Sequence, residues 1–253
     1  MIGVYLSGTG NTQHCVELLC KTIDPDAKVI PIEDSSAVTE IHAADEIVLG
    51  YPTQFSNVPF MVRDFIQSHS VLWRGKKVFC LVTMGAFSGD GAGCAARLLR
   101  KAGAQILGGM HIKMPDSVCD SKLLKKTVEQ NQQIIAEADK KIKAAAKDIL
   151  HGKYPQDGLS VSAHIAGLFG QRLWFSEKTK GYSDRLKISQ ACTGCGICTK
   201  ICPMHNLELK HGKAVPHGKC TMCYRCISCC PKQAITLLGN MVQEQTRFEK
   251  FSR

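Results

Sequence analysis

Two cysteine runs near the end of the chain restrict its fold more than any other feature. Residues 192–203 read CTGCGICTKICP and residues 220–231 read CTMCYRCISCCP, so the pattern C-x2-C-x2-C-x3-C-P occurs twice, the second time 28 residues after the first. A zinc site uses four ligands in all, usually arranged as pairs, and does not require two triplets with matching Cys-Pro endings. The repeat therefore predicts two matched metal sites within one small domain.

This spacing resembles that of bacterial-type ferredoxins with two [4Fe–4S] clusters. In that pattern a tight loop wraps three corners of one cube of iron and sulfur, and the fourth cysteine completes the other cube. The resulting ligand sets are Cys192, Cys195, Cys198 and Cys230 for cluster I, and Cys220, Cys223, Cys226 and Cys202 for cluster II. We interpret the adjacent Cys229 as a packed free thiol; the alternative is that it replaces Cys230 as a ligand.

The secondary structure around the cysteines is predicted to repeat as well. LELKHGKAVPHG (207–218) has the pattern of strand, turn and strand, and AITLLG (234–239) follows the second Cys-Pro as LELKHG follows the first. We therefore expect residues 186–240 to form a small α+β domain of the ferredoxin type with a two-fold internal repeat. Residues 241–253 are expected to form a C-terminal tail.

Length and cysteine usage limit the class of protein. A chain of 253 residues is long enough for two domains. Its fourteen cysteines come without a signal peptide, so we expect reduced thiols rather than disulfides. No run of 18 apolar residues occurs, and the expectation is a soluble, cytoplasmic protein without a transmembrane segment. The five cysteines outside the two runs are interpreted as small buried hydrophobes: Cys15, Cys20, Cys80, Cys94 and Cys119.

The formal net charge of +10 raises the question of a nucleic-acid partner. The basic residues are spread along the chain, and each [4Fe–4S] cluster with its thiolates adds a charge of about −2. An acidic protein partner therefore fits better than nucleic acid. The oligomeric state is not predicted.

Residues 1–150 alternate short apolar runs with helical patterns, which predicts a doubly wound parallel α/β sheet. KVFCLVT (77–83) is apolar throughout, as in a strand that is buried on both faces. The predicted strands are 2–6, 28–32, 46–50, 77–83 and 106–114. The predicted helices are 12–23, 60–69, 91–103 and 122–150.

The loop after the first strand, SGTGNT (7–12), leads directly into a helix. Its glycines allow the backbone to wrap an anion, its hydroxyls and amide supply donors, and the helix N-terminus adds unpaired N–H groups. These features indicate a phosphate site without lysine or arginine. The alternative is a hydroxyl-rich helix cap.

Two further loops leave the same edge of the predicted sheet: YPTQFSNVP (51–59) and TMGAFSGDG (83–91). Each holds an aromatic ring, Tyr51 or Phe55 in one and Phe87 in the other, among small residues. This composition suits a flat ring system edged by backbone donors, although Phe55 and Phe87 are also plausible core residues.

With these three loops, residues 1–150 resemble a flavodoxin, whose fold is a five-stranded parallel sheet that binds FMN. The resemblance implies that residues 7–12 hold the phosphate and that the other two loops enclose the ring. The implied FMN residues are Ser7, Gly8, Thr9, Gly10, Asn11, Thr12, Pro52, Thr53, Gln54, Phe55, Ser56, Asn57, Thr83, Met84, Gly85, Ala86, Phe87, Gly89 and Asp90.

Residues 151–185 form a predicted linker with one helical segment. LSVSAHIAGLFGQRLWF (159–175) has helical spacing, and we expect its apolar face to pack between the two domains. His164 on this stretch is interpreted as structural. SEKTKGYSDR (176–185) has the composition of a polar linker.

The order of the two modules resembles flavodoxin–ferredoxin fusion proteins of anaerobes. That resemblance implies an electron carrier that relays electrons between two [4Fe–4S] clusters and FMN, and exchanges them with redox proteins such as a ferredoxin, a reductase or a client enzyme. The alternatives are an FMN-dependent reductase with its own small-molecule substrate or NAD(P)H, and a redox-responsive binding protein. No catalytic residue is identified. Asp90 and Asp116 are near the predicted flavin, but a helix cap and a turn explain them more simply.

Overall fold

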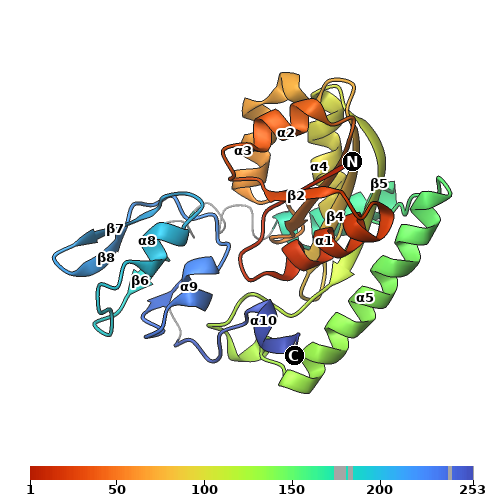
Figure 1. Ribbon diagram of the computed structural model, residues 1–253. Helices are drawn as coiled ribbons and strands as arrows, with labels where there is room; N and C mark the ends of the chain where they lie inside the picture. The colour runs from red at the N-terminus through yellow and green to blue at the C-terminus, as the bar shows by residue number, and fades with distance from the viewer. Residues whose placement is uncertain (174–180, 182–184, 239–240, 253) are drawn as a thin grey trace.

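The N-terminal part of the chain forms a five-stranded parallel sheet in the order β2-β1-β3-β4-β5 (Figure 1). This computed structural model describes the whole chain except residues 174–180, 182–184, 239–240 and 253. The strands are β1 (Ile2–Tyr5), β2 (Lys28–Pro31), β3 (Glu46–Pro52), β4 (Lys77–Met84) and β5 (Gln105–Lys113). The order 2-1-3-4-5 is the flavodoxin-like version of the doubly wound sheet, so the predicted fold class is confirmed.

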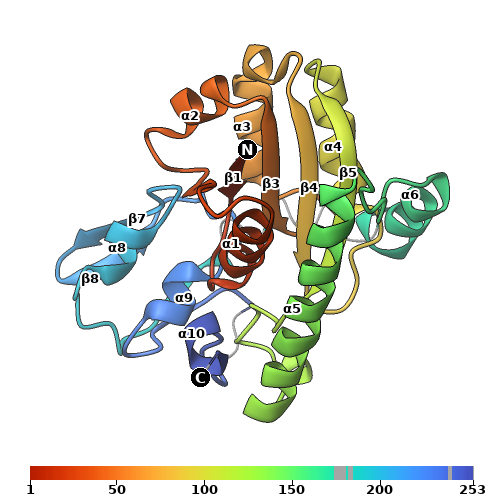
Figure 2. The ribbon, with the colours of Figure 1, turned by 45° about the vertical axis from the view of Figure 1, so that its right-hand side comes forward.

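Two hydrophobic cores lie on opposite faces of this sheet, because successive strand residues point to opposite sides. Leu49 of β3 packs in one core and its neighbour Val48 in the other. One face is covered by α2 (Ala37–Ala43), α3 (Phe60–Ser68) and α4 (Gly91–Lys101). The other is covered by α1 (Asn11–Ile23) and α5 (Val128–Leu150), in front of the sheet in Figure 2. A 3₁₀ turn, η1 (Ser70–Trp73), precedes β4.

Two predictions for this half were wrong in detail. The long helix begins at Val128 rather than at residue 122, because Thr127 and Gln130 form a capping box that fixes its start. Residues Lys122–Leu124 form a separate 3₁₀ turn, η2, and Leu124 is exposed there. Helix α2 was not predicted, because a helix of seven residues is too short to show a clear period.

The C-terminal module repeats its backbone as well as its cysteines. Helices α8 (Ile197–Ile201) and α9 (Arg225–Cys229) are 28 residues apart, and each follows the first two cysteines of its run and contains the third. Strand β6 (Lys187–Ile188) pairs antiparallel with β9 (Ile235–Thr236), and β7 (Leu207–Lys210) forms a hairpin with β8 (Lys213–Pro216). The predicted α+β module with an internal repeat is confirmed.

The predicted tail returns to the N-terminal half as helix α10 (Phe248–Phe251). Phe251 is buried in the same core as α1 and α5, and the ring of Phe248 stacks on His14 with centroids 4.2 Å apart. The backbone N–H of Phe248 donates to the carbonyl of Thr9 at 2.8 Å. The end of the chain therefore forms part of the first module's packing.

The segment before the cysteine module forms α6 (Val161–Gly167) and a π-helical turn, η3 (Leu168–Arg172), beside β5 and α4 (Figure 2). Our expectation for its apolar face was wrong: four of its side chains are exposed rather than packed between the modules, namely Val161, Ile165, Phe169 and Leu173. Residues 174–175 of that segment and most of the predicted linker 176–185 lie outside the described residues. Within the described ranges, no helix is long and apolar enough to cross a membrane.

Candidate cofactor sites

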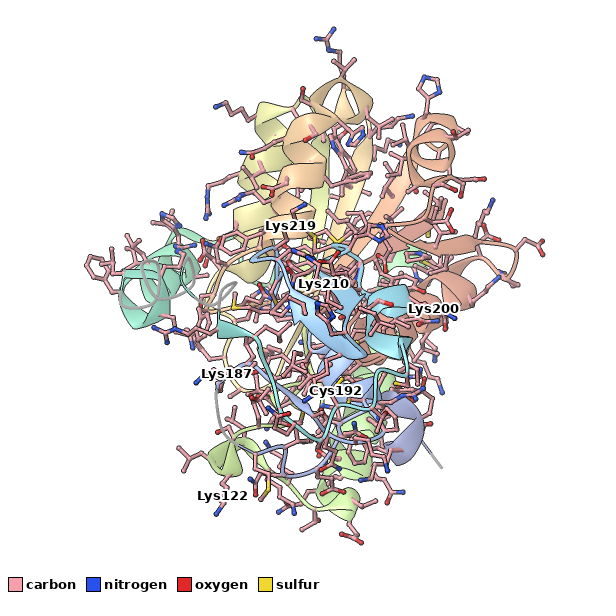
Figure 3. The ribbon with its side chains drawn as sticks, turned by 90° about the vertical axis from the view of Figure 1, so that its left-hand side faces the viewer. Lys122, Lys187, Cys192, Lys200, Lys210 and Lys219 are labelled. Carbon is pink, nitrogen blue, oxygen red and sulfur yellow. The ribbon has the colours of Figure 1, made fainter. Side chains whose placement is uncertain are left out.

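The four cysteines predicted for cluster I line one small cavity in the C-terminal module. Cys195 is exposed, Cys198 is buried, and Cys192 and Cys230 are half-buried. Figure 3 shows Cys192 on the face of the module that points away from the sheet. This set of cysteines is therefore brought together at the surface of the protein.

The four cysteines predicted for cluster II line a second cavity, which is deeper in the molecule. Cys226 is buried and the other three are half-buried. Cys229 lines neither of the two cavities. In the described part of the chain, no three His, Cys, Asp or Glu side chains gather as a single metal ion requires. The sulfurs instead surround a space between them, which suits a polynuclear cluster.

Backbone N–H groups donate to the cysteine sulfurs at equivalent positions of the repeat. Asn206 N–H donates to Cys202 Sγ and Ala234 N–H to Cys230 Sγ, both at 3.3 Å. Hydrogen bonds of this kind tune the potential of an iron–sulfur cluster. The equivalent cysteine in each half of the repeat therefore accepts a backbone hydrogen bond, which favours the negatively charged thiolate form of that cysteine.

The two cavities differ in how easily their thiols ionise. Backbone N–H groups of Ala214 and Gly194 lower the pKa of Cys192, whereas burial raises the pKa of Cys223 to about 12. A cysteine binds metal as the thiolate, and positive metal charge is what keeps a buried thiol deprotonated. Burial raises the pKa of Cys198 as well, so the outer set combines a thiol that ionises more readily with one that ionises less readily.

A larger cavity of about 360 Å³ lies at the carboxyl ends of β3, β4 and β5. Residues from both predicted ring loops line it, and so does Asn11 of the first loop. The lining residues that the sequence analysis named are Asn11, Pro52, Thr53, Gln54, Phe55, Thr83, Met84, Gly85, Ala86 and Phe87. A space of this size, apolar with a few polar groups, is typical of a small-molecule site.

Two buried polar atoms beside this cavity lack a partner within the described protein: Asn11 Oδ1 and Thr53 Oγ1. A buried polar group without a hydrogen bond costs about 1–3 kcal/mol, so an orphaned pair at a cavity wall indicates a ligand that completes it. The hydroxyl of Thr53 can donate and the amide oxygen of Asn11 can accept. The residues present therefore fit a flat, polar-edged group such as the FMN ring.

The first loop follows β1, and the hydroxyls of Ser7 and Thr12 form hydrogen bonds within the protein. Ser7 Oγ accepts from Gly10 N–H at 3.1 Å, and Thr12 Oγ1 lies 2.8 Å from Thr83 Oγ1. The N-cap residue of α1 is Gly10, which has no side chain to cap the helix, and the hydroxyl of Ser7 accepts from its N–H. Apart from Asn11, these residues do not line the large cavity, so the phosphate role of 7–12 stays a prediction.

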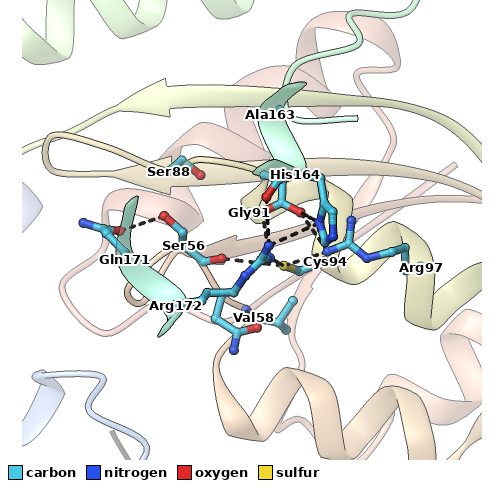
Figure 4. A network of polar contacts seen from close by, with 12 residues as sticks. Ser56, Val58, Ser88, Gly91, Cys94, Arg97, Ala163, His164, Gln171 and Arg172 are labelled. Carbon is cyan, nitrogen blue, oxygen red and sulfur yellow. Dashed lines mark hydrogen bonds and ion pairs between the residues drawn. The ribbon is translucent and has the colours of Figure 1, made fainter. Parts of the chain in front are cut away.

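Four residues of the predicted ring loops lie away from the cavity: Ser56, Asn57, Gly89 and Asp90. The buried carboxylate of Asp90 binds Arg97 at 2.7 Å, Arg172 at 2.7 Å and His164 at 2.8 Å. Figure 4 shows Arg97, His164 and Arg172 of this network pointing toward one another. Burial raises the pKa of Asp90, but these hydrogen bonds outweigh it and hold the pKa below its usual value. Asp90 therefore fixes α6 and η3 to α4, and its placement in the flavin site was wrong.

Tyr51 and Phe87 illustrate the two outcomes for the aromatic residues. Tyr51 is fully buried and donates its hydroxyl to the carbonyl of Gly91 at 2.8 Å, so it is a core residue. Phe87 is 45% exposed and lines the cavity beside η3, where Gln171 also reaches the cavity wall.

The inner cysteine loop forms one wall of the large cavity, through Met222, Cys223 and Tyr224. Gln54 of the β3 loop donates to the carbonyls of Thr221 at 2.8 Å and Met222 at 3.2 Å. Gly8 lies so close to this loop that a Cβ on it would be 1.6 Å from the carbonyl oxygen of Cys223. Only glycine permits that approach.

Arg225, between two of the predicted cluster II ligands, joins the modules. Its guanidinium donates to the carbonyl of Ser7 at 2.7 Å, to Glu33 at 2.5 Å and to the carbonyl of Ile201 at 3.1 Å. The cluster II loop, the first loop and the β2–α2 loop are thus held by one side chain.

A further wall of the cavity is formed by residues after β5, of which the sequence had placed only Asp116 near the predicted flavin. Asp116 lines it, accepts from the N–H of Val118 at 2.9 Å, and has a pKa that burial raises. Asp120 is fully buried and supports the other wall: it accepts from Tyr224 Oη at 3.0 Å and from the N–H groups of Leu237 and Leu238 at 2.8 Å.

Known proteins are similar to the cysteine module and to the sheet module separately. A family model described as "4Fe-4S dicluster domain" matches residues 191–235. Over 28 residues the chain is 54% identical to Ferredoxin-2 of Desulfomicrobium norvegicum, a match of 11% of this chain and 48% of that protein. The chain thus covers about half the length of the curated relative that it matches.

The N-terminal half is similar to solved flavodoxins. It shares 24% identity and a TM-score of 0.43 with the two-electron reduced flavodoxin of Megasphaera elsdenii, covering 58% of this chain and 98% of that one. A flavodoxin from the domain Archaea gives 22% identity and a TM-score of 0.40, over 56% of this chain and 97% of that one. The assignment of the fold depends on the strand order rather than on these scores. Strand order, cysteine spacing and family match together fit a flavodoxin–ferredoxin fusion.

Proposed function

We propose that the protein relays electrons between two [4Fe–4S] clusters and FMN and exchanges them with redox partner proteins. The observation that carries this proposal is the shared wall: Cys223 lines both the cavity of the predicted cluster II and the large cavity of the sheet. A ligand of one centre is thereby in reach of the other. A relay needs such contact, whereas two independent carriers on one chain do not.

The ligands in this proposal are the two cysteine sets named above. FMN would be held by residues that line this cavity, including Phe55 and Phe87, with Asn11 and Thr53 supplying polar contacts. When bound, FMN accepts two electrons and releases them singly, whereas each cluster carries one electron at a time. The chain itself supplies proximity, burial and hydrogen bonds to sulfur. A reducing compartment such as the cytoplasm would keep the thiolates available.

The arrangement favours a carrier over a reductase with its own substrate. The large cavity is walled on one side by the cluster II loop and on another by η3. The space is of the size of one small ligand, and its orphaned polar atoms are those that a bound ring would satisfy. A reductase would need to admit a second small molecule to the same ring.

The test uses protein that is isolated without oxygen, with iron and FMN counted per chain. NADH, NADPH and dithionite-reduced ferredoxin are then added separately while flavin and cluster absorbance are followed together. The relay predicts that reduced ferredoxin bleaches both centres and that neither nucleotide does. Rapid bleaching of the flavin by a nucleotide would favour the reductase, and protein without flavin would contradict both.

A further inference from the structure

The C-terminal module carries an excess of positive charge. Between residues 186 and 238 there are six lysines and one arginine, but a single carboxylate, Glu208. Arg225 is used internally, as described above, so the lysines make up the surface charge. These lysines are Lys187, Lys200, Lys210, Lys213, Lys219 and Lys232.

Lysines lie on the same face of the module as the outer cysteine cavity. Figure 3 shows Lys187, Lys200, Lys210 and Lys219 on the face that carries Cys192. Lys232 lines the cavity itself, beside the exposed Cys195. We call the six lysines of the module, together with the outer cavity, the lysine face.

Charge on the lysine face is largely unpaired. Glu208 pairs with both Lys210 and His217, and Lys213 donates to the side-chain oxygen of Gln190. Among the described residues, Lys187, Lys200, Lys219 and Lys232 make no ion pair. In the sheet module, Lys28 pairs with Glu40, Lys77 with Glu46 and Lys141 with Asp157.

Uncompensated charge of one sign around a small exposed site attracts a partner of the opposite sign and speeds its encounter. The partner must also be able to react at the outer cysteine site, which in the proposed function is a one-electron centre. A nucleic acid would meet the charge but exchange no electron with the cluster. A small protein with its own acidic face around a redox centre meets both conditions.

We propose that the lysine face is the docking surface for a small acidic one-electron carrier protein, which exchanges electrons with cluster I. This proposal rests on the proposed function and adds the place where electrons enter or leave the protein. One electron passes from the reduced carrier to oxidised cluster I, or in reverse, with no bond made or broken. Electrons then enter or leave at the outer loop, and the inner loop faces the flavin.

The experiment follows cluster absorbance in a stopped-flow instrument under anaerobic conditions. The donor is a bacterial-type ferredoxin of net negative charge, reduced with dithionite and desalted. The test variant is K200Q/K210Q/K219Q, and the matched control K101Q/K143Q/K153Q removes three exposed lysines from the sheet module. Iron and FMN content establish that each variant is intact. Methyl viologen radical, which is small and cationic, measures reduction without docking.

We expect the second-order rate constant with ferredoxin to fall about tenfold in the test variant at low ionic strength, and its salt dependence to flatten. The control should change less than about twofold, and methyl viologen should reduce all three proteins at equal rates. Equal losses in test and control variants, or no loss in either, would overturn the proposal. Displacement of the ferredoxin by a short DNA duplex, lost in the test variant alone, would make the face a nucleic-acid surface.

This measurement tests the docking surface separately from the proposed electron relay. If ferredoxin reduces cluster I with the expected lysine dependence but the flavin stays oxidised, the relay fails and the docking surface stands. If methyl viologen drives electrons from the clusters to the flavin while ferredoxin shows no lysine dependence, the relay stands and the docking surface fails.

Discussion

The two cysteine loops have the same backbone and different surroundings. Gly194 and Gly196 of the outer loop have φ of +68° and +74°, and the equivalent residues of the inner loop, Met222 and Tyr224, have φ of +55° and +62°. A side chain in this left-handed region costs about 1–2 kcal/mol. The inner loop therefore keeps two strained residues where the outer loop has glycine.

The strain is offset by what these side chains pack against. Met222 and Tyr224 are buried, line the large cavity and belong to the core of the C-terminal module. At the next equivalent pair, the outer loop has Ile197, which is 40% exposed, and the inner loop has Arg225, which joins the modules. One repeat unit has thus been adapted to face solvent and the other to face the sheet module.

The largest expected effect comes from removing one cluster at a time. Cys202→Ser deprives cluster II of a ligand, and Cys230→Ser does the same for cluster I. Each should remove about half of the iron, since a cluster short of one thiolate is lost from its loop. Only Cys202→Ser should leave a cluster that ferredoxin still reduces while the flavin is cut off from it. Iron analysis and the stopped-flow traces measure both effects.

Cys229→Ser is the control for this pair, because Cys229 lines neither cysteine cavity. It should retain all of its iron. Loss of half the iron in Cys229→Ser, with Cys230→Ser intact, would mean that Cys229 is the ligand.

The next effect tests the contact between the modules. Arg225→Ala removes hydrogen bonds to Ser7, Glu33 and Ile201 and strands the Glu33 carboxylate, which is only 18% exposed. Truncating one partner of a largely buried charge pair costs about 2 kcal/mol or more. For a chain of this size that lowers Tm by about 4–8 °C. Anaerobic calorimetry of the holoprotein measures it.

The equivalent change in the outer loop, Ile197→Ala, should shift Tm by much less, since the side chain is already partly in water. Arg63→Ala, which breaks an exposed pair with Asp64, serves as a control for loss of an arginine. A drop of equal size in all three variants would show that the two loops do not differ as described.

Much of this fold could be predicted from the sequence. The alternation of apolar runs and helical periods identified all five strands, because each strand of a covered parallel sheet must be apolar along its length. Cysteine spacing likewise grouped the eight cysteines that line the two small cavities. Both patterns are local and depend on neighbouring positions in the chain.

The contacts between the modules were not predictable in the same way. Each of these contacts joins residues more than a hundred positions apart: Gln54 with Thr221, Arg225 with Ser7, and Gly8 with Cys223. No local period in the sequence marks them. One signal was available: aligning the two repeats places Met222 and Tyr224 against glycines, and Arg225 against Ile197. A bulky or charged residue at the position of a loop glycine or an apolar residue indicates a special surface.

A smaller effect is expected where the strained inner loop closes the flavin cavity. Met222→Gly relieves backbone strain but opens the wall that Met222 forms. We expect iron content to stay the same and the FMN dissociation constant to rise about fivefold, equivalent to about 1 kcal/mol. Fluorescence titration of the deflavinated protein measures it. In the outer loop, Gly196→Ala should leave FMN binding unchanged, and an equal loss of affinity there would contradict the inward role of Met222.

The smallest effect concerns two carboxylates. Asp116 lines the large cavity on the inner side, and Glu208 lies on the outer side of the C-terminal module. Burial raises the pKa of Asp116, partly opposed by the N–H of Val118 and by Lys126, whereas the hydrogen bond from Lys210 is the main cause that lowers the pKa of Glu208. Both carboxyls are protonated in the folded and the unfolded protein only at a pH below the lowered pKa of Glu208. As pH rises through the raised pKa of Asp116, folding loses stability, because the charged form is disfavoured in the cavity. Glu208 instead adds stability as pH rises through its lowered pKa.

Neutral substitutes should therefore act in opposite directions at pH 7. Asp116→Asn keeps an acceptor for Val118 N–H and removes the buried charge, so Tm should rise slightly. Glu208→Gln loses attraction to Lys210 and His217 at an exposed site, so Tm should fall slightly. Both differences from the wild type should shrink as pH falls toward 4, and calorimetry across that range measures them. A Tm that falls at pH 7 in Asp116→Asn would mean that the inner cavity stabilises a charged carboxylate, and the inner side would then resemble the outer one in its electrostatics.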